Sequence, residues 1–268
     1  MGITGSYIYP SNLPVVKGKL SYDVINYLWD IIEKAKIKND LHNNKLAGNI
    51  DASYALVDEN NYLFDNGLGR LVNDYYNDFL DSTKGNNITN NPFAEDSIQI
   101  RSLVLKDLWV NFQKEHEFNP IHEHAGVFSF VIWLKIPFTY KEQNQISIAK
   151  NSNSPKVSLF EFSYMDILGN QMSHEIPLGR EDEGTICVFP ASLRHVVYPF
   201  FNCKEERVSI SGNIYFSVND PVGTDRNEQE EIKEGVFDCQ NAVELTGELP
   251  DIDIETMNFQ STGGISAK

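Results

Sequence analysis

Cysteine is scarce in this sequence. Its 268 residues include only Cys187, Cys203 and Cys239, and no two of them are spaced as Cys-x-x-Cys. An odd number without that spacing argues against a disulfide framework and against a zinc knuckle. Cys187 stands in an apolar stretch, where we expect it to be a small buried hydrophobe. We find no basic-then-apolar leader and no apolar run long enough to cross a bilayer, and we therefore predict a cytoplasmic protein.

Positive charge is also scarce. The chain has 22 lysines and arginines against 38 acidic residues, a net charge of −16, and the basic residues form no run. Nucleic acids and anionic membranes are polyanions, so neither is expected as a main partner. The charge is uneven, because residues 217–268 hold twelve acidic and three basic residues, or nine of the net negative charges. We predict an acidic, flexible C-terminal extension over 217–268 whose charges form a solvated surface.

The sequence has neither an internal repeat nor a glycine-rich phosphate loop. Its first part instead predicts two amphipathic helices, one starting after the N-cap candidate Ser21 and one running from about Tyr62 to Thr83. Apolar residues recur there at helical spacing: Val24, Ile25, Leu28, Ile31, Ile32 and Ala35, then Phe64, Leu68, Leu71, Val72, Tyr75 and Phe79. We expect residues 1–97 to be helical support within the same domain, with residues 1–20 an irregular lead or an edge strand.

Residues 98–216 have a different character, with short β-branched and aromatic segments separated by turn formers. The expected strands are one or two within Ile98–Phe112, followed by Val127–Ile136, Gln145–Lys150, Lys156–Tyr164, Gln171–Ile176, Gly184–Phe189, His195–Pro199 and Glu206–Phe216. Strands at this spacing are typical of a jelly-roll sandwich or barrel. The predicted fold is therefore α+β and mainly β, a double-stranded β-helix (jelly-roll or cupin-like) core over 98–216 with N-terminal supporting helices.

Three histidines have the spacing of a metal site. His122 and His124 stand at i and i+2 at the start of an expected strand, so both side chains point to the same face while Glu123 points away. His195 begins a distant strand. We predict that these three residues bind a metal. The other three histidines, His42, His116 and His174, are expected to be ordinary polar residues.

An arginine on the last expected strand adds a second element to the site. Three imidazoles on one side of a metal leave open positions, and iron(II) with an α-keto acid as co-substrate fits such a site. The far carboxylate of the keto acid needs a buried cation, and the planar fork of Arg207 suits it. Ser209 and Asn213 lie on the same strand face in a regular strand, and we predict that they also contact the co-substrate.

These residues carry a resemblance to a known family. The segments WVNFQKEHEFNPIHEHAG, FSFVIWLKIP, GTICVFPASLRHVVYPF and ERVSISGNIYF resemble the core of the 2-oxoglutarate- and iron(II)-dependent oxygenases, and more narrowly members encoded by phages with a prolyl-hydroxylase-like core. The resemblance covers roughly 40% of the chain. It implies that His122 and His195 are iron ligands and that Arg207 and Ser209 hold 2-oxoglutarate. A viral origin would place the protein in the host cytoplasm.

The sequence departs from the family pattern at one position. The family motif is usually His-x-Asp/Glu, and His124 stands here where that carboxylate is expected. Either His124 completes a three-histidine site or a carboxylate comes from elsewhere, the candidates being Glu123, Glu161 and Asp166. We favour the three histidines. Other residues are given smaller roles: Asn111 and Asn119 at the pocket mouth, and Trp109, Phe130 and Trp133 in the core.

The function predicted from the sequence is that of an Fe(II)- and 2-oxoglutarate-dependent hydroxylase that uses O2. A protein side chain is the first choice of substrate, with a nucleotide or a small metabolite as alternatives. Two other functions stay open. One is a three-histidine, cupin-like metalloprotein without an arginine clamp, and the other is a non-enzymatic structural or binding jelly-roll of a phage. Replacement of Arg207 separates the oxygenase from the cupin-like protein.

Overall fold

A computed structural model describes residues 15–39, 41–75 and 100–218 of the chain. All elements named below belong to the unit Met1–Pro221. The acidic extension expected over 217–268 lies outside the described residues beyond residue 218, and so does the second half of the helix expected from Tyr62 to Thr83.

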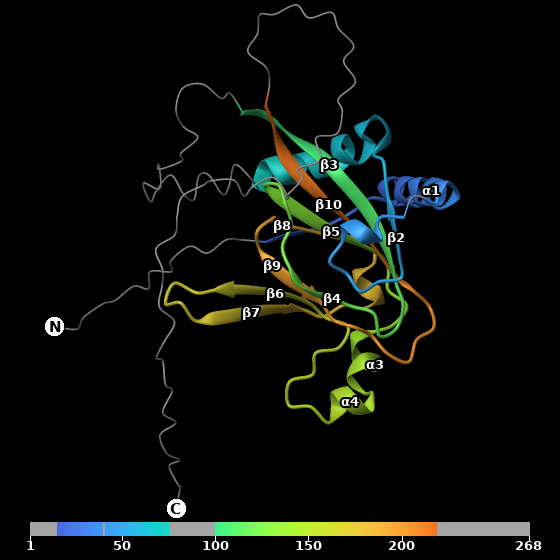
Figure 1. The fold of residues 1–268 in the computed structure, drawn as a ribbon, viewed down its shortest axis with the longest axis vertical. Coiled ribbons are helices and arrows are strands. Elements are labelled where there is room, and N and C mark those ends of the chain that lie inside the picture. The colour runs from blue at the N-terminus through green and yellow to red at the C-terminus, as the bar shows by residue number, and fades with distance from the viewer. Residues whose placement is uncertain (1–14, 40, 76–99, 219–268) are drawn as a thin grey trace, which may run out of the picture. The chain divides into compact units, whose positions relative to one another are not determined.

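Two antiparallel sheets make up the described fold (Figure 1). The six-stranded sheet has the order β1-β8-β5-β10-β3-β2, and the four-stranded sheet has the order β4-β9-β6-β7. The strands are β1 Val16–Lys19, β2 Ala52–Ala55, β3 Ile100–Gln113, β4 Asn119–His122, β5 Phe128–Lys135, β6 Phe160–Met165, β7 Gln171–Ile176, β8 Thr185–Pro190, β9 Arg194–Val197 and β10 Arg207–Val218. The predicted fold class, α+β and mainly β with a jelly-roll core and N-terminal supporting helices, is confirmed.

The central strands of the six-stranded sheet are buried on both faces. Along β5, Phe130 and Ile132 join one apolar cluster, while Val131 and Trp133 join another. Successive side chains of a strand point to opposite faces, so the two clusters lie on opposite sides of the sheet. This explains why β5 has the sequence FSFVIWLK, with no regular polar alternation.

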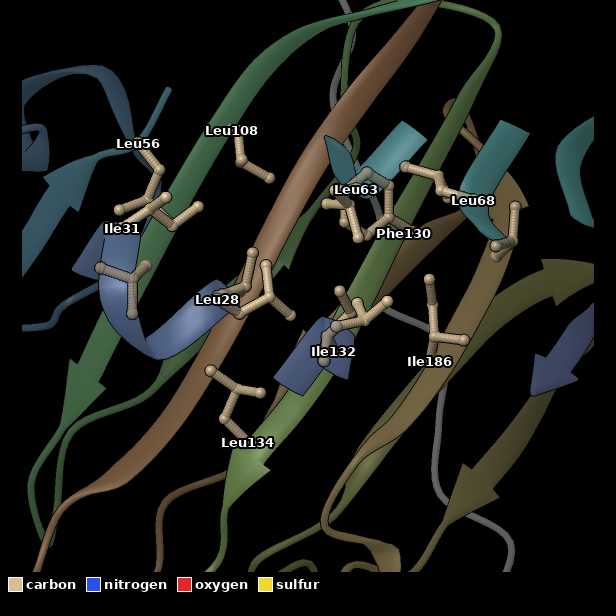
Figure 2. Close-up of a cluster of buried hydrophobic side chains, with 14 of the residues drawn as sticks. Leu28, Ile31, Leu56, Leu63, Leu68, Leu108, Phe130, Ile132, Leu134 and Ile186 are labelled. Atoms are coloured by element: carbon tan, nitrogen blue, oxygen red, sulfur yellow. The ribbon is translucent and has the colours of Figure 1, made fainter. Parts of the chain in front are cut away.

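Helices cover one of these faces (Figure 2). Helix α1 spans Tyr22–Lys38, and its buried residues are Val24, Leu28, Ile31, Ile32 and Ala35, as its helical spacing predicted. The Ser21 hydroxyl accepts a hydrogen bond from the backbone N–H of Val24, and Asn39 ends the helix in the left-handed conformation. Leu28 and Ile31 belong to the same buried cluster as Leu108, Phe130 and Ile132 of the sheet, and Figure 2 shows Leu28 beside Ile132.

The second predicted helix is present in its described part. Residues 62–75 are helical, with a π-helical turn at Phe64–Leu68. Leu68, Val72 and Tyr75 are buried in the same cluster as α1. Short 3-10 turns also occur at Asn43–Lys45, Glu59–Asn61 and Arg180–Asp182.

The other face of the six-stranded sheet packs against the four-stranded sheet. Trp133 on β5 makes an edge contact with Phe160 on β6, with ring centroids 5.7 Å apart. Phe189 on β8 contacts Phe162 on β6 at 5.0 Å. These aromatic residues fill one part of the space between the sheets, and the predicted site residues face the remaining part.

One predicted strand is wrong. Residues 140–150 form two short helices, α3 at Tyr140–Asn144 and α4 at Ser147–Lys150, where a strand was expected over Gln145–Lys150. Thr139 and Glu142 form a capping box that starts α3. This local signal outweighs the weak strand pattern because it satisfies backbone N–H groups that a strand would leave to a neighbour.

Two strands were not expected as separate elements. β2 extends the six-stranded sheet beside β3, and β4 carries Pro120 at the edge of the four-stranded sheet. An edge position suits proline, which has no N–H for a further strand. β1 is the edge strand that was one alternative for residues 1–20. No helix in the described parts of the chain is long and apolar enough to cross a membrane.

Candidate metal and anion site

The three histidines predicted as ligands come together between the sheets. His122 on β4 is directly opposite His195 on β9, and His124 follows β4 by two residues. One ring nitrogen from each residue lies within 4.8 Å of those from the other two. The Nε2 atoms of His124 and His195 are 3.2 Å apart. The main chain supports this arrangement, since the N–H of His124 donates to the carbonyl of Ala191 at 2.9 Å.

Backbone carbonyls determine which ring nitrogen carries the proton in two of the three histidines. The Nδ1 atom of His122 lies 2.7 Å from the Pro120 carbonyl, and that of His195 lies 3.0 Å from the Leu193 carbonyl. A carbonyl only accepts hydrogen bonds, so Nδ1 carries the proton in both neutral rings and Nε2 keeps its lone pair. Metal-binding histidines are commonly oriented in this way. The donor set therefore fits a divalent transition metal.

Burial keeps the three imidazoles neutral. It lowers the pKa of His122, and it lowers the pKa of His195 well below the ordinary value of 6.5. The pKa of His124 falls to about 4, because of burial and then because of the neighbouring His122. A protonated imidazole cannot bind a metal, so lowered pKa values leave all three rings available at neutral pH.

Arg207 is a buried cation without an acidic partner among the described residues. Its side chain is 1% exposed. Nε and Nη2 donate to the Gln113 side-chain oxygen at 3.0 and 2.6 Å, Nη2 also donates to the Tyr198 carbonyl at 3.1 Å, and Nη1 donates to the Ser158 carbonyl at 3.3 Å. Burial lowers the pKa of Arg207 to about 9, which leaves it charged at neutral pH. All its protein partners are neutral oxygens.

A cavity of about 190 Å³ joins the histidines to the arginine. His122, His124, His195, Arg207 and Ser209 all line it. Trp109, Asn111, Asn119 and Trp133, which were assigned to the pocket mouth or the core, line it as well. Aromatic side chains, including Trp109, Trp133, Phe160 and Phe189, alternate with polar side chains that converge on the same space. Apolar walls with convergent polar groups are typical of a small-molecule site.

Asn213 lies on the inner face of β10 but is not among the residues that line this cavity. Its amide oxygen accepts a hydrogen bond from Ser129 at 2.9 Å, and its amide nitrogen donates to Asp107 at 3.1 Å. Tyr215 donates to the same Asp107 oxygen at 3.1 Å. Contact between Asn213 and a co-substrate stays a prediction, and the structure gives this residue protein partners.

The three alternative carboxylates have other partners. Glu123 pairs with Arg194 at 3.2 Å and does not belong to the histidine cluster. Glu161 pairs with Lys156. Asp166 accepts hydrogen bonds within its own turn, from the backbone N–H groups of Leu168 and Asn170. Within the described ranges, the cluster of possible metal ligands contains the three histidines and no carboxylate.

The remaining histidines lie outside this cluster. His116 and His174 are exposed, and His42 packs beside Trp109 with ring centroids 6.2 Å apart. The interpretation of these residues as ordinary polar side chains agrees with their positions.

Two parts of the site were not predicted from the sequence. Gln113, the partner of Arg207, continues the inner face of β3 two residues beyond Asn111, so period-2 alternation could have identified it. The loop that carries Lys45, Leu46, Ala47 and Ile50 also lines the cavity. Asn43 ties this loop down through bonds to the Ile50 carbonyl and the Ser53 N–H. No sequence signal linked this turn-rich segment to residues far along the chain.

Comparison with known proteins supports the resemblance noted in the sequence. Residues 107–213 match the model of a family described as "Putative 2OG-Fe(II) oxygenase". This range contains all six residues predicted to bind metal or co-substrate, together with Gln113. The predicted resemblance to the oxygenases is confirmed over this range, whereas a phage origin stays a prediction. The cofactors that the family description names are the ones expected from the sequence. No curated protein matches the chain.

Two solved structures are similar to this chain at low identity. A prolyl-4-hydroxylase from Pseudomonas putida has 12% sequence identity and a TM-score of 0.43, and the match covers 76% of this chain and 94% of that chain. An oxidoreductase of the 2OG-Fe(II) oxygenase family from Burkholderia pseudomallei has 15% identity and a TM-score of 0.41, covering 75% and 85% of the two chains.

Proposed function

We propose that this protein is an Fe(II)- and 2-oxoglutarate-dependent oxygenase that hydroxylates a C–H bond of its substrate. The overall reaction converts substrate, O2 and 2-oxoglutarate into hydroxylated substrate, succinate and CO2. One observation carries the proposal: three neutral imidazoles with converging ring nitrogens share a small cavity with a buried, uncompensated arginine. The family match over residues 107–213 supports it.

The protein's own residues have distinct tasks in this proposal. His122, His124 and His195 hold Fe(II), and the carbonyls behind His122 and His195 keep two of their rings in the binding tautomer. Bound iron(II) with 2-oxoglutarate supplies the activation of O2 for oxidation of an unreactive bond. Arg207 and Ser209 bind the distal carboxylate of the keto acid, and the aromatic sidewalls exclude water.

The proposed substrate is a protein side chain. The cavity reaches the surface beside Lys45 and Glu123, both of which are exposed. A side chain can enter a cavity of this size while its backbone stays outside. Incubation with candidate peptides, Fe(II), 2-oxoglutarate and O2, followed by mass spectrometry, should show the gain of one oxygen atom on a single residue. Oxidation of free nucleotides or small metabolites alone would contradict this choice of substrate.

A second function is favoured by one specific observation, namely that no carboxylate joins the histidine cluster in the described residues. A cupin-like metalloprotein with three histidines needs no keto acid and no arginine clamp. A non-enzymatic jelly-roll would be expected to have a filled interior beside His122, and the cavity there argues against it.

Anaerobic absorption spectroscopy separates these functions. We expect a weak visible charge-transfer band that requires both Fe(II) and 2-oxoglutarate and that disappears in His195→Ala. Arg207→Lys keeps the charge but loses the planar fork, so it should retain metal binding and weaken 2-oxoglutarate binding at least about tenfold. Arg70→Ala, which removes an exposed arginine, is the control. Tight metal binding with no band would favour the cupin-like protein.

A further inference from the structure

Gln113 occupies a position where an acidic residue would normally be expected. It lies directly opposite Arg207 in the β3–β10 ladder and is 3% exposed. Burial of a cation is costly, and buried cations are generally paired with acids. Here the cross-strand partner is a neutral amide whose oxygen accepts from both Nε and Nη2 of the guanidinium.

The orientation of this amide is determined by its neighbours. The Gln113 side-chain nitrogen donates to the Glu117 carbonyl at 2.5 Å. A carbonyl cannot donate and a guanidinium cannot accept, so only one assignment of the amide oxygen and nitrogen satisfies both contacts. The turn between Lys114 and Glu117 is itself fixed in position, because the Glu117 carboxylate accepts hydrogen bonds from the backbone N–H groups of Lys114 and Asp51 at 2.7 and 3.0 Å.

These contacts use most of the hydrogen-bond donors of the guanidinium but do not neutralise its positive charge. An arginine side chain has five N–H groups, and four hydrogen bonds to protein oxygens leave one, on Nη1. The rings of Phe200 and Phe138 lie 5.6 and 6.0 Å from the guanidinium carbon and restrict its position. The Ser209 hydroxyl lines the same cavity and has no partner among the described residues.

We propose that Gln113 is a positioning and specificity residue, which orients Arg207 without neutralising it and so makes the site prefer a dicarboxylic keto acid to a monocarboxylic one. This inference rests on the proposed function and deepens it. A glutamate in place of Gln113 would supply the missing negative charge from within the protein. The distal carboxylate of the co-substrate would then meet an already compensated cation and a like charge.

The test uses two variants of the full-length chain. Gln113→Glu adds the charge, and Gln113→Met removes the amide while roughly keeping its length. Each protein is titrated anaerobically, with Fe(II) bound, using 2-oxoglutarate and separately 2-oxobutyrate, which lacks the distal carboxylate. The charge-transfer band gives both dissociation constants. Gln143→Glu is the matched control, since Gln143 is also 3% exposed and also bonds backbone groups, at Phe201.

We expect Gln113→Glu to weaken 2-oxoglutarate binding by about 10- to 100-fold, because a charged hydrogen-bonded contact is lost. Gln113→Met should weaken 2-oxoglutarate binding by about tenfold, since Arg207 keeps its charge but loses the amide oxygen that orients its guanidinium. Binding of 2-oxobutyrate should stay unchanged in both variants. The carboxylate introduced by Gln113→Glu would also face the Glu117 carbonyl. That cost is present with and without a bound keto acid, so it cancels within each dissociation constant.

The possible outcomes distinguish a failure of the role proposed for Gln113 from a failure of the proposed oxygenase function. An unchanged ratio of the two dissociation constants, whether or not both keto acids bind more weakly, would overturn the role of Gln113 while leaving the proposed oxygenase function intact. A wild-type protein that gives no band with either keto acid would overturn both. If Gln113→Glu does not fold, as judged by circular dichroism, the ratio measured for Gln113→Met decides the question.

Discussion

At the scale of single residues, the site depends on which atoms carry protons. Pro120 and Leu193 contribute only their carbonyls, yet these determine which nitrogen of His122 and of His195 is free to bind a metal. Arg207 has the opposite property, since all of its partners accept and none is charged. The neutral imidazoles thus attract a cation, and the uncompensated guanidinium attracts an anion, within one cavity.

Cys187 provides a prediction about stability and pH at this scale. It is fully buried between the sheets, and burial raises its pKa from 9.0 to about 12. Below pH 9 the thiol is protonated in both the folded and the unfolded chain. Above pH 9 the unfolded chain loses the proton first, so the free energy of unfolding falls as pH rises toward 12.

Wild-type protein should therefore lose up to about 1.4 kcal/mol per pH unit in this window relative to Cys187→Ala. Urea unfolding of both proteins at several alkaline pH values measures this difference. The comparison cancels the contribution of titrating groups that do not interact with Cys187. Parallel pH dependence in the two proteins would show that the thiol ionises freely in the folded state.

At the scale of the elements, each central strand of the six-stranded sheet packs against the helices with one face and toward the four-stranded sheet with the other. Along β10, Val208, Ile210 and Ile214 pack against the helix-covered layer, while Arg207 and Ser209 face the cavity. The strand that carries the proposed clamp is thus fixed by apolar contacts on its other face. The cost of burying Arg207 is offset by packing that does not involve the site.

A substitution in α1 tests this separation of layers. Leu28 is fully buried against the sheet, and Leu28→Ala should lower the free energy of unfolding by roughly 2–5 kcal/mol. Ile37→Ala on the same helix should change it by less than about 0.5 kcal/mol, because Ile37 is 85% exposed. Chemical unfolding provides the measurement. Metal affinity of folded Leu28→Ala should equal that of wild type, and a large loss of affinity would show that the two layers are coupled.

At the scale of the whole molecule, ligands that bind only the folded chain should stabilise it. A metal or co-substrate present at 100 times its dissociation constant contributes about 2.7 kcal/mol. For a chain of this size, that corresponds to a rise in Tm of about 5–10 °C. We expect Fe(II) to raise Tm under anaerobic conditions and 2-oxoglutarate to raise it further only when metal is present.

His195→Ala is the control for this thermal experiment, because it removes a proposed metal ligand from the protein interior. It should abolish both shifts. Retention of the metal-dependent shift in this variant would place the metal elsewhere, for example on acidic surface groups, which are numerous in a chain with a net charge of −16.

Much of the fold could be predicted from local sequence patterns. Helix α1 was predicted with its cap and its buried face because Ser21 and a 3.6-residue apolar period act within the helix itself. The i, i+2 spacing of His122 and His124 likewise fixed a shared face. The helices at 140–150 were missed because the Thr139–Glu142 capping box is a two-residue signal within a short segment.

The sequence by itself determined the mainly β class, the two supporting helices and the set of candidate ligands, because these follow from periodicity and residue chemistry within short stretches. Only the tertiary structure decided that His195 stands opposite His122, that Gln113 faces Arg207, and that the loop from Lys45 to Ile50 lines the cavity. Register between distant strands depends on packing across both layers, and no local pattern specifies it. The charge balance of the cavity follows from that register.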